Sequence, residues 1–124
     1  MTKLPEAVSN AWDDRKGPVV LTTVAEDGTP NAIYATCVSK YDEEHLVVAD
    51  NFFGKTRANL KAGSPASLLF ITNEGNAYQV KGAVEYATEG AYFDDMKCWN
   101  GTRPGNAAAV LCVDAVFSGS TKLA

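Results

Sequence analysis

The stretch VVADNFFGKTRANL, residues 47–60, indicates more about the fold than any other part of the chain. Its first residues are typical of a strand, residues 50–54 form a turn rich in Asp, Asn and Gly, and a short helix then begins. A strand that ends at a helix start presents unpaired backbone N–H groups and the positive end of the helix dipole. We therefore predict an anion site here, where Lys55 adds a point charge, Thr56 a hydroxyl and Arg57 a guanidinium suited to phosphate oxygens.

Size and charge narrow the class of protein. The chain has 124 residues, 46% of them hydrophobic, which predicts a single folded domain over 1–124. The net charge of -4 argues against nucleic acid as the main partner, although one small phosphate ligand needs only a local basic cluster. No apolar run is long enough to span a membrane, and residues 1–6 lack the apolar centre of a signal peptide. We therefore expect a cytoplasmic protein without a membrane partner.

Cysteine and histidine do not predict a metal site. The three cysteines, Cys37, Cys98 and Cys112, share no CxxC spacing, and His45 is the only histidine. We expect three reduced thiols, mostly buried, and no resident metal. His45 follows an acidic turn and is expected at the surface, and no Ser or Cys partner lies near it to build a hydrolytic triad.

Hydrophobic patterns on both sides of residues 47–60 predict a small β-barrel. Residues 77–86 alternate most clearly, and their apolar face is expected to point inward. The expected strands are 19–24, 32–38, 45–49, 66–72, 77–86 and 107–117, and the expected helices are 4–15, 55–62 and 90–99. Inward positions are expected at Tyr78, Val80, Gly82, Val84 and Tyr86, and one face of the last strand at Ala109, Leu111, Val113, Ala115 and Phe117. Six strands joined mostly by hairpins predict an antiparallel barrel.

Four pieces of the chain, in this order, carry a resemblance to a known family. They are Glu26-Asp27-Gly28 and the segments at 54–59 (GKTRAN), 78–85 (YQVKGAVE) and 107–110 (AAAV). Their order and spacing resemble the small bacterial FMN-binding proteins of the pyridoxamine 5′-phosphate oxidase-like superfamily. This resemblance implies a mainly β fold, a six-stranded antiparallel split β-barrel with short flanking helices, and FMN as the cofactor.

The resemblance also implies roles for individual residues. Lys55 and Thr56 would hold the FMN phosphate, with Asn59 nearby, and the second strand would offer its backbone to the flavin ring. The remaining implied contacts are Tyr34, Ala35 and Thr36 along the ring, and Asp50, Asn51 and Phe52 beside the ribityl chain or ring. Such proteins are generally homodimers with FMN at the interface, so Gln79, Trp99 and Arg103 would reach FMN from the partner chain.

Simpler structural readings of several of these residues stay open. Tyr34 and Thr36 are equally typical of outward strand positions, and Trp99 closes a helical stripe with Tyr92 and Met96 that favours a core or dimer contact. The true oxidase has a longer chain with an Arg- and His-bearing region near its C-terminus. Residues 117–124 contain no Arg-x-His pair, so we do not expect oxidation of pyridoxamine phosphate.

Several functions fit this pattern. The first is an FMN-dependent oxidoreductase or electron carrier, in which FMN carries the chemistry and electrons come from a nicotinamide or a redox partner protein. The second is a non-redox binding module for haem or a phosphorylated vitamin, for which His45, Cys or Met would be the only axial haem ligands. A deazaflavin-dependent reductase on the same barrel is a related alternative. An oligonucleotide-binding barrel is disfavoured by the acidic charge.

Overall fold

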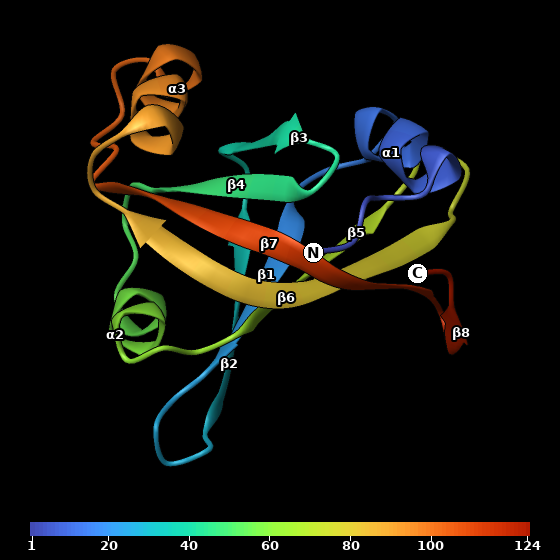
Figure 1. Ribbon diagram of the computed structural model, residues 1–124, viewed down its shortest axis with the longest axis horizontal. Coiled ribbons are helices and arrows are strands. Elements are labelled where there is room, and N and C mark those ends of the chain that lie inside the picture. Colours follow the sequence, from blue (N-terminus) through green and yellow to red (C-terminus); the bar gives the residue numbers. More distant parts are fainter.

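The computed structural model describes all 124 residues as one curled antiparallel sheet with three helices (Figure 1). The strands are β1 (Val19–Val24), β2 (Pro30–Ala35), β3 (Val38–Asp42), β4 (His45–Asp50), β5 (Ala66–Ile71), β6 (Ala77–Ala87), β7 (Ala107–Ser118) and β8 (Thr121–Lys122). The helices are α1 (Glu6–Asp13), α2 (Lys55–Lys61) and α3 (Ala91–Asn100). The mainly β fold predicted from the sequence is confirmed, and none of the helices is long and apolar enough to cross a bilayer.

Eight strands form where six were predicted, because the predicted strand 32–38 divides between β2 and the start of β3, and because the short β8 was not predicted. The strand order is β2-β1-β5-β6-β7-β4-β3, with β8 on β7. The predicted strand 32–38 ends at Ala35, and the chain then leaves the β1 ladder and pairs with β4 from Val38 onward. Periodicity alone does not reveal this change of partner, because both halves have strand-like side chains. Two strands that are consecutive in sequence therefore form the two edges of the curled sheet.

The inner face of the sheet holds the main core. Eighteen buried residues form one cluster, which includes the predicted stripe of Leu4, Val8 and Trp12, although Leu4 lies before α1 because the helix begins at Glu6. Trp12 meets Phe70 edge-to-face at a centroid distance of 5.2 Å. On β6 the predicted inward residues do face this core, since Val80 belongs to the cluster and Tyr78, Val84 and Tyr86 pack against it.

A second, smaller core lies between α3 and the outer face of the sheet. Met96 is fully buried against Val47 and Val110, with Tyr92 and Trp99 packed beside them. The predicted helical stripe is therefore a packing stripe. Since β4 is covered on one face by the main core and on the other by α3, all six of its residues are buried. This doubly covered strand leads directly into the turn after residue 49.

A β-bulge on β7 changes which residues point inward. Gly82 of β6 lies opposite Val113 and Lys81 lies opposite Ala115, so Asp114 is an extra residue on β7. Beyond the bulge the alternation reverses, and Val116 is fully buried while Phe117 is only partly buried. The prediction that Ala115 and Phe117 share one face with Ala109, Leu111 and Val113 is therefore wrong.

Gly82 is required at the bulge by lack of space. A Cβ atom added there would lie 1.8 Å from the carbonyl oxygen of Cys112. We expect Gly82→Ala to lower the free energy of unfolding by roughly 3 kcal/mol, measured by urea unfolding followed by circular dichroism. The exposed neighbour Ala83→Ser should change it by less than about 0.5 kcal/mol. Equal stability of the two variants would contradict this account of the bulge.

Candidate functional site

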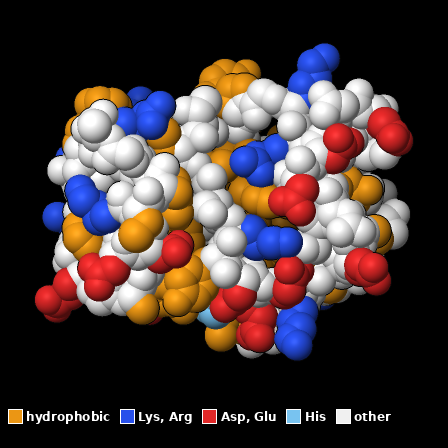
Figure 2. Space-filling model, turned by 90° about the horizontal axis from the view of Figure 1, so that it is seen from above, with side chains coloured by type: hydrophobic (Ala, Val, Ile, Leu, Met, Phe, Trp, Pro, Cys, Tyr) orange, Lys and Arg blue, Asp and Glu red, His pale blue; other side chains and the backbone are white.

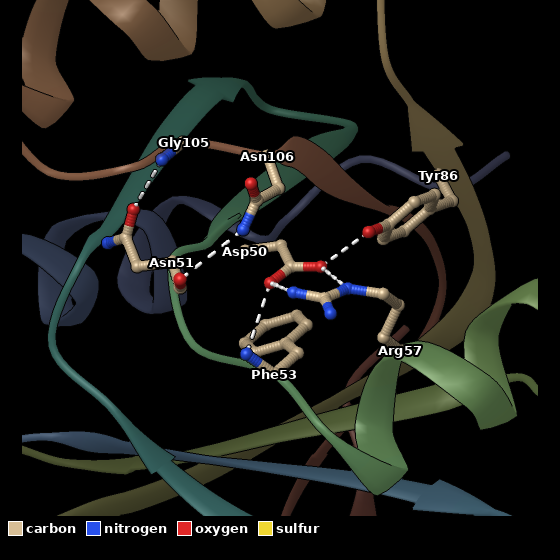
Figure 3. Close-up of polar contacts among 7 residues, drawn as sticks. All are labelled: Asp50, Asn51, Phe53, Arg57, Tyr86, Gly105 and Asn106. Atoms are coloured by element: carbon tan, nitrogen blue, oxygen red, sulfur yellow. Dashed lines mark hydrogen bonds and ion pairs between the residues drawn. The ribbon is translucent and has the colours of Figure 1, made fainter.

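The turn after β4 is organised around the carboxylate of Asp50, which is completely buried (Figure 3). Arg57 donates two hydrogen bonds to it, from Nε to Oδ2 at 2.8 Å and from Nη2 to Oδ1 at 2.8 Å. The backbone N–H of Phe53 donates to Oδ1 at 3.1 Å, and the hydroxyl of Tyr86 donates to Oδ2. The carboxylate therefore ties together the end of β4, the turn, α2 and β6.

These contacts keep Asp50 ionised. Burial raises the pKa of the Asp50 carboxyl, but hydrogen bonds from Arg57, Tyr86 and Phe53, together with the Arg57 charge, outweigh it and hold the pKa below its usual value. Burial and the hydrogen bond to Asp50 in turn raise the pKa of the Tyr86 hydroxyl. The group is a stable ion pair at neutral pH, which suits a structural role better than proton transfer.

The two basic residues of the predicted anion site, Arg57 and Lys55, therefore differ in whether they have an acidic partner. The Arg57 guanidinium is bound to Asp50, although the sequence suggested that it would face phosphate oxygens. Lys55 is exposed and forms no ion pair, and the backbone N–H groups at residues 55–57 have no backbone acceptor. The open donors at the start of α2 are therefore Lys55 and the backbone itself.

The other predicted phosphate residues, Thr56 and Asn59, lie on the buried face of α2. Asn31 donates from Nδ2 to Thr56 Oγ1 at 2.9 Å, and Asn59 donates from Nδ2 to Thr23 Oγ1 at 3.0 Å. These contacts fix α2 to β1 and β2. Sequence reasoning missed Thr23 and Asn31, because they become neighbours of α2 only through the folding of the sheet.

A groove with a volume of about 350 Å³ runs from the end of β2 to the turn after β4. Most of its lining is apolar or aromatic, and it brings together five of the residues predicted as cofactor contacts: Tyr34, Ala35, Thr36, Asn51 and Phe52. Tyr34 is 78% exposed and Phe52 is 84% exposed, which is unusual for large aromatic side chains. Such aromatic residues beside a groove indicate a binding surface.

A smaller, more polar cavity of about 280 Å³ adjoins the groove. Thr36, Cys37 and Arg103 line both hollows, and Trp99 lines the smaller one. The Trp99 indole N–H donates to Asp95 at 3.2 Å, and Arg103 makes one long hydrogen bond, 3.5 Å, to the carbonyl of Asn100. The Arg103 guanidinium is exposed and has no carboxylate partner.

Gln79 does not join these residues within one chain. It lies on the outer face of β6, in a shallow hollow with Thr22, Ser67 and Lys81. A contact between Gln79 and a ligand in the groove would therefore have to come from a second chain.

His45 is buried, which corrects the predicted surface position. It is 8% exposed, and its Nδ1 lies 2.7 Å from Oδ1 of Asp42. Tyr41 and Tyr92 cover its ring, and in the view of Figure 2 only a small area of histidine is visible. The same view shows Lys and Arg side chains scattered among acidic ones, without a continuous basic patch on that face.

Comparison with known proteins decides the family. Residues 5–115 match the pyridoxamine 5′-phosphate oxidase family. The chain belongs to this family. A curated relative, an uncharacterized protein of Methanocaldococcus jannaschii, is 33% identical over 76 residues, which cover 60% of this chain and 51% of the relative. The chain therefore spans about half the length of the curated relative that it matches.

Solved structures share the fold of this family member. HupZ of Group A Streptococcus has a TM-score of 0.82 at 23% identity and 96% coverage of both chains. An FMN-binding protein of Syntrophomonas wolfei has a TM-score of 0.75 at 20% identity, covering 90% of this chain and 83% of its own. An F420 reductase has a TM-score of 0.69 at 22% identity, covering 92% and 98%. At these identities the likeness extends to the fold alone.

The ion pair at the turn makes stability depend on pH. Because the folded-state pKa of Asp50 is depressed, its contribution is complete above the unfolded value near 3.8 and disappears as pH falls through the folded value. We expect Asp50→Asn to lower the free energy of unfolding at pH 7 by about 1–3 kcal/mol. The difference between wild type and variant should shrink below about pH 4, measured by urea unfolding across pH. A difference that stays constant into acid would show that the charge of Asp50 is not what stabilises the turn.

Proposed function

We propose that this protein binds FMN and acts as an oxidoreductase or electron carrier of the pyridoxamine 5′-phosphate oxidase-like type. The observation that carries the proposal is the groove flanked by the exposed rings of Tyr34 and Phe52, close to the open start of α2. A flat apolar ring system with a phosphate tail matches a groove with apolar walls and an anion-binding end. Family membership and the FMN-binding protein of the same fold support this choice.

The phosphate end would be held by backbone and side chain together. Lys55 supplies an exposed positive charge, and the open N–H groups at the start of α2 supply donors. The Thr56 hydroxyl already accepts from Asn31, and its own proton remains available to a phosphate oxygen. Asn59 supports this corner by holding Thr23.

The ring end would be held mainly by β2. This strand pairs only with β1, so alternate residues along it turn their N–H and C=O groups to the open edge, and Thr36 lies just beyond its last paired residue, Ala35. Donors at that edge would bind the polar side of the ring and shift its reduction potential. Bound FMN would supply hydride or electron transfer, for which no protein acid–base pair is required. The adjoining cavity beside Trp99 and Arg103 would receive the electron donor, a nicotinamide or a partner protein. Because the chain has no dinucleotide-binding glycine motif, a nicotinamide would dock there only transiently.

A homodimer with FMN at the interface is part of the proposal. A row of directly opposed residues crosses the outer face of the sheet: Tyr34, Val20, Leu69, Gln79 and Phe117. Leu69 is 42% exposed and Ile71, on the same face, is 44% exposed. Tyr34 belongs to both this row and the groove, so a second chain on the row would lie next to the flavin and could bring its own Gln79 there.

A deazaflavin cofactor is the second candidate, because the F420 reductase has this fold and such a cofactor is also a planar ring with a phosphate-bearing tail. A haem module is less well supported, since His45 is buried against Asp42 and Met96 is fully buried. Mass spectrometry of the ligand released from native protein would distinguish these cofactors. Three unpaired cysteines fit a reducing compartment, and we place the protein in the cytoplasm.

The direct test is FMN binding. Purified protein should show a flavin absorption spectrum or quench FMN fluorescence on titration. Lys55→Ala should weaken FMN binding by about 1–3 kcal/mol, roughly 5- to 150-fold, through loss of a charged contact to phosphate.

Lys61→Ala is the matched control, because it removes the same charge from the other end of α2. It should leave FMN affinity within about twofold of wild type, a difference of roughly 0.4 kcal/mol. A colourless protein that does not take up FMN would overturn the proposed function. Unchanged affinity in Lys55→Ala would remove only Lys55 from the site.

Dimerisation is tested at Leu69. A charge at the centre of the apolar row should oppose association, so we expect Leu69→Lys to be monomeric by analytical ultracentrifugation and to bind FMN at least about tenfold more weakly, roughly 1.4 kcal/mol. Leu123→Lys changes a leucine of nearly equal exposure, 41%, beyond β8 and should remain dimeric. A monomeric wild type that binds FMN would refute the interface and leave the cofactor assignment intact.

A further inference from the structure

Asn51 joins the turn at the candidate site to the far end of α3. Its Nδ2 donates to Asn100 Oδ1 at 3.1 Å, and Asn100 Nδ2 donates back to Asn51 Oδ1 at 2.8 Å. Both side chains are buried, at 9% and 1% exposure. A reciprocal amide pair of this kind satisfies groups that would be costly to leave unpaired in the interior.

Asn51, together with Asp50, also holds the loop between α3 and β7 (Figure 3). The N–H of Gly105 donates to Asn51 Oδ1 at 2.9 Å, and Asn106 donates from Nδ2 to the carbonyl of Asn51 at 3.3 Å. The N–H of Asn106 donates to the carbonyl of Asp50 at 2.8 Å. This loop therefore takes its position from residues 50 and 51.

Gly105 makes that close approach feasible. Its φ of +54° lies in the left-handed region, and a Cβ atom there would lie 3.0 Å from both Asn100 Nδ2 and Lys97 Nζ. Lys97 closes the loop from the other side by donating to the carbonyl of Pro104 at 3.1 Å. Residues 104–106 of the loop are thus held from two sides, by Asn51 and by Lys97, although the loop contains two glycines.

Arg103 depends on this loop for its place. It lines both the groove and the adjoining cavity, and its only side-chain hydrogen bond is the 3.5 Å contact to the carbonyl of Asn100. Asp50, which fixes α2 through Arg57, is the residue next to Asn51. Consecutive residues therefore hold the start of α2 and the loop that carries Arg103.

We propose that the Asn51–Asn100 pair positions Arg103 at the flavin groove, so that a cofactor bound at the turn and groove further orders residues 101–106. The claim that the pair positions Arg103 concerns the protein alone. The claim that a bound cofactor further orders residues 101–106 rests on the proposed function. By linkage, a cofactor that favours the ordered loop gains affinity from the contacts that order it. Asn51 and Asn100 are positioning residues, because they act through the loop.

Amide hydrogen exchange at Gly105 and Asn106 tests the proposal. In wild type, saturating FMN should slow exchange of these two N–H groups at least about tenfold. In cofactor-free protein, Asn100→Ala should speed exchange at Gly105 at least about tenfold relative to wild type, and FMN should no longer restore the protection. FMN affinity should fall in Asn100→Ala and in Arg103→Gln, and the double variant should lose less than the product of the two losses.

Asn73→Ala is the matched control, because Asn73 also bridges distant segments by bonding to Asp14 next to α1, at the opposite end of the molecule from α3 (Figure 1). It should leave FMN affinity and exchange at Gly105 unchanged. Multiplicative losses in the double variant, or unchanged exchange at Gly105 in cofactor-free Asn100→Ala, would overturn the positioning role. FMN that binds wild type without protecting Gly105 and Asn106 would overturn the cofactor part.

Two further results distinguish failure of this proposal from failure of the proposed FMN-binding function. Absence of FMN binding in wild type would refute the proposed function, and the cofactor-free comparison of Asn100→Ala with wild type would still decide the positioning role. If Asn100→Ala does not fold, Asn106→Ala cuts one loop contact and keeps the amide pair. It should raise exchange at Gly105 by a smaller factor, and no change would count against the proposal.

Discussion

The buried carboxylate of Asp50 is the constraint on which the candidate site depends. An ionised group without access to water must be neutralised by its neighbours, and here the neighbours come from the turn, α2 and β6. The geometry of that neutralisation places the start of α2 beside the end of β4. Because the Arg57 guanidinium is paired with Asp50, the donors available to an anion are Lys55 and the unpaired backbone N–H groups at the start of α2.

The sheet supplies the other half of the site. Because β4 is covered by the main core on one face and by α3 on the other, its end cannot move far, and the turn inherits that rigidity. The groove lies where β2 ends at one edge of the sheet and where the turn after β4 begins. Rigid elements thus carry both of its walls, as a binding site for a planar ligand requires.

The sequence predicted the elements better than their partners. Alternation on β6 and the stripes of α1 and α3 were enough to place inward faces, because local periodicity reflects burial directly. The division of the strand at residues 36 and 37, the bulge at Asp114 and the burial of His45 depend on which strands become neighbours, and no local pattern encodes that choice.

The residues of the candidate site also divide into those that the sequence could predict and those that depend on long-range packing. The resemblance placed Tyr34, Thr36, Asn51 and Phe52 around one ligand, because they lie on the second predicted strand or directly after the third, and the structure brings them to one groove. Asn100, Gly105 and Tyr86 were not foreseen, since each meets the turn only through long-range packing. A polar residue before a glycine, as at Asn100 and Gly101, is too common in turns to have marked them.

The position of β2 at an open edge of the sheet has a consequence for solution behaviour. An edge strand with unpaired N–H and C=O groups is a template on which another strand can add. The exposed ring of Tyr34 on this strand increases this risk. A ligand bound along that edge would block strand addition there and so oppose aggregation. If the proposed cofactor binds there, its supply during expression would affect how much of the chain stays in solution.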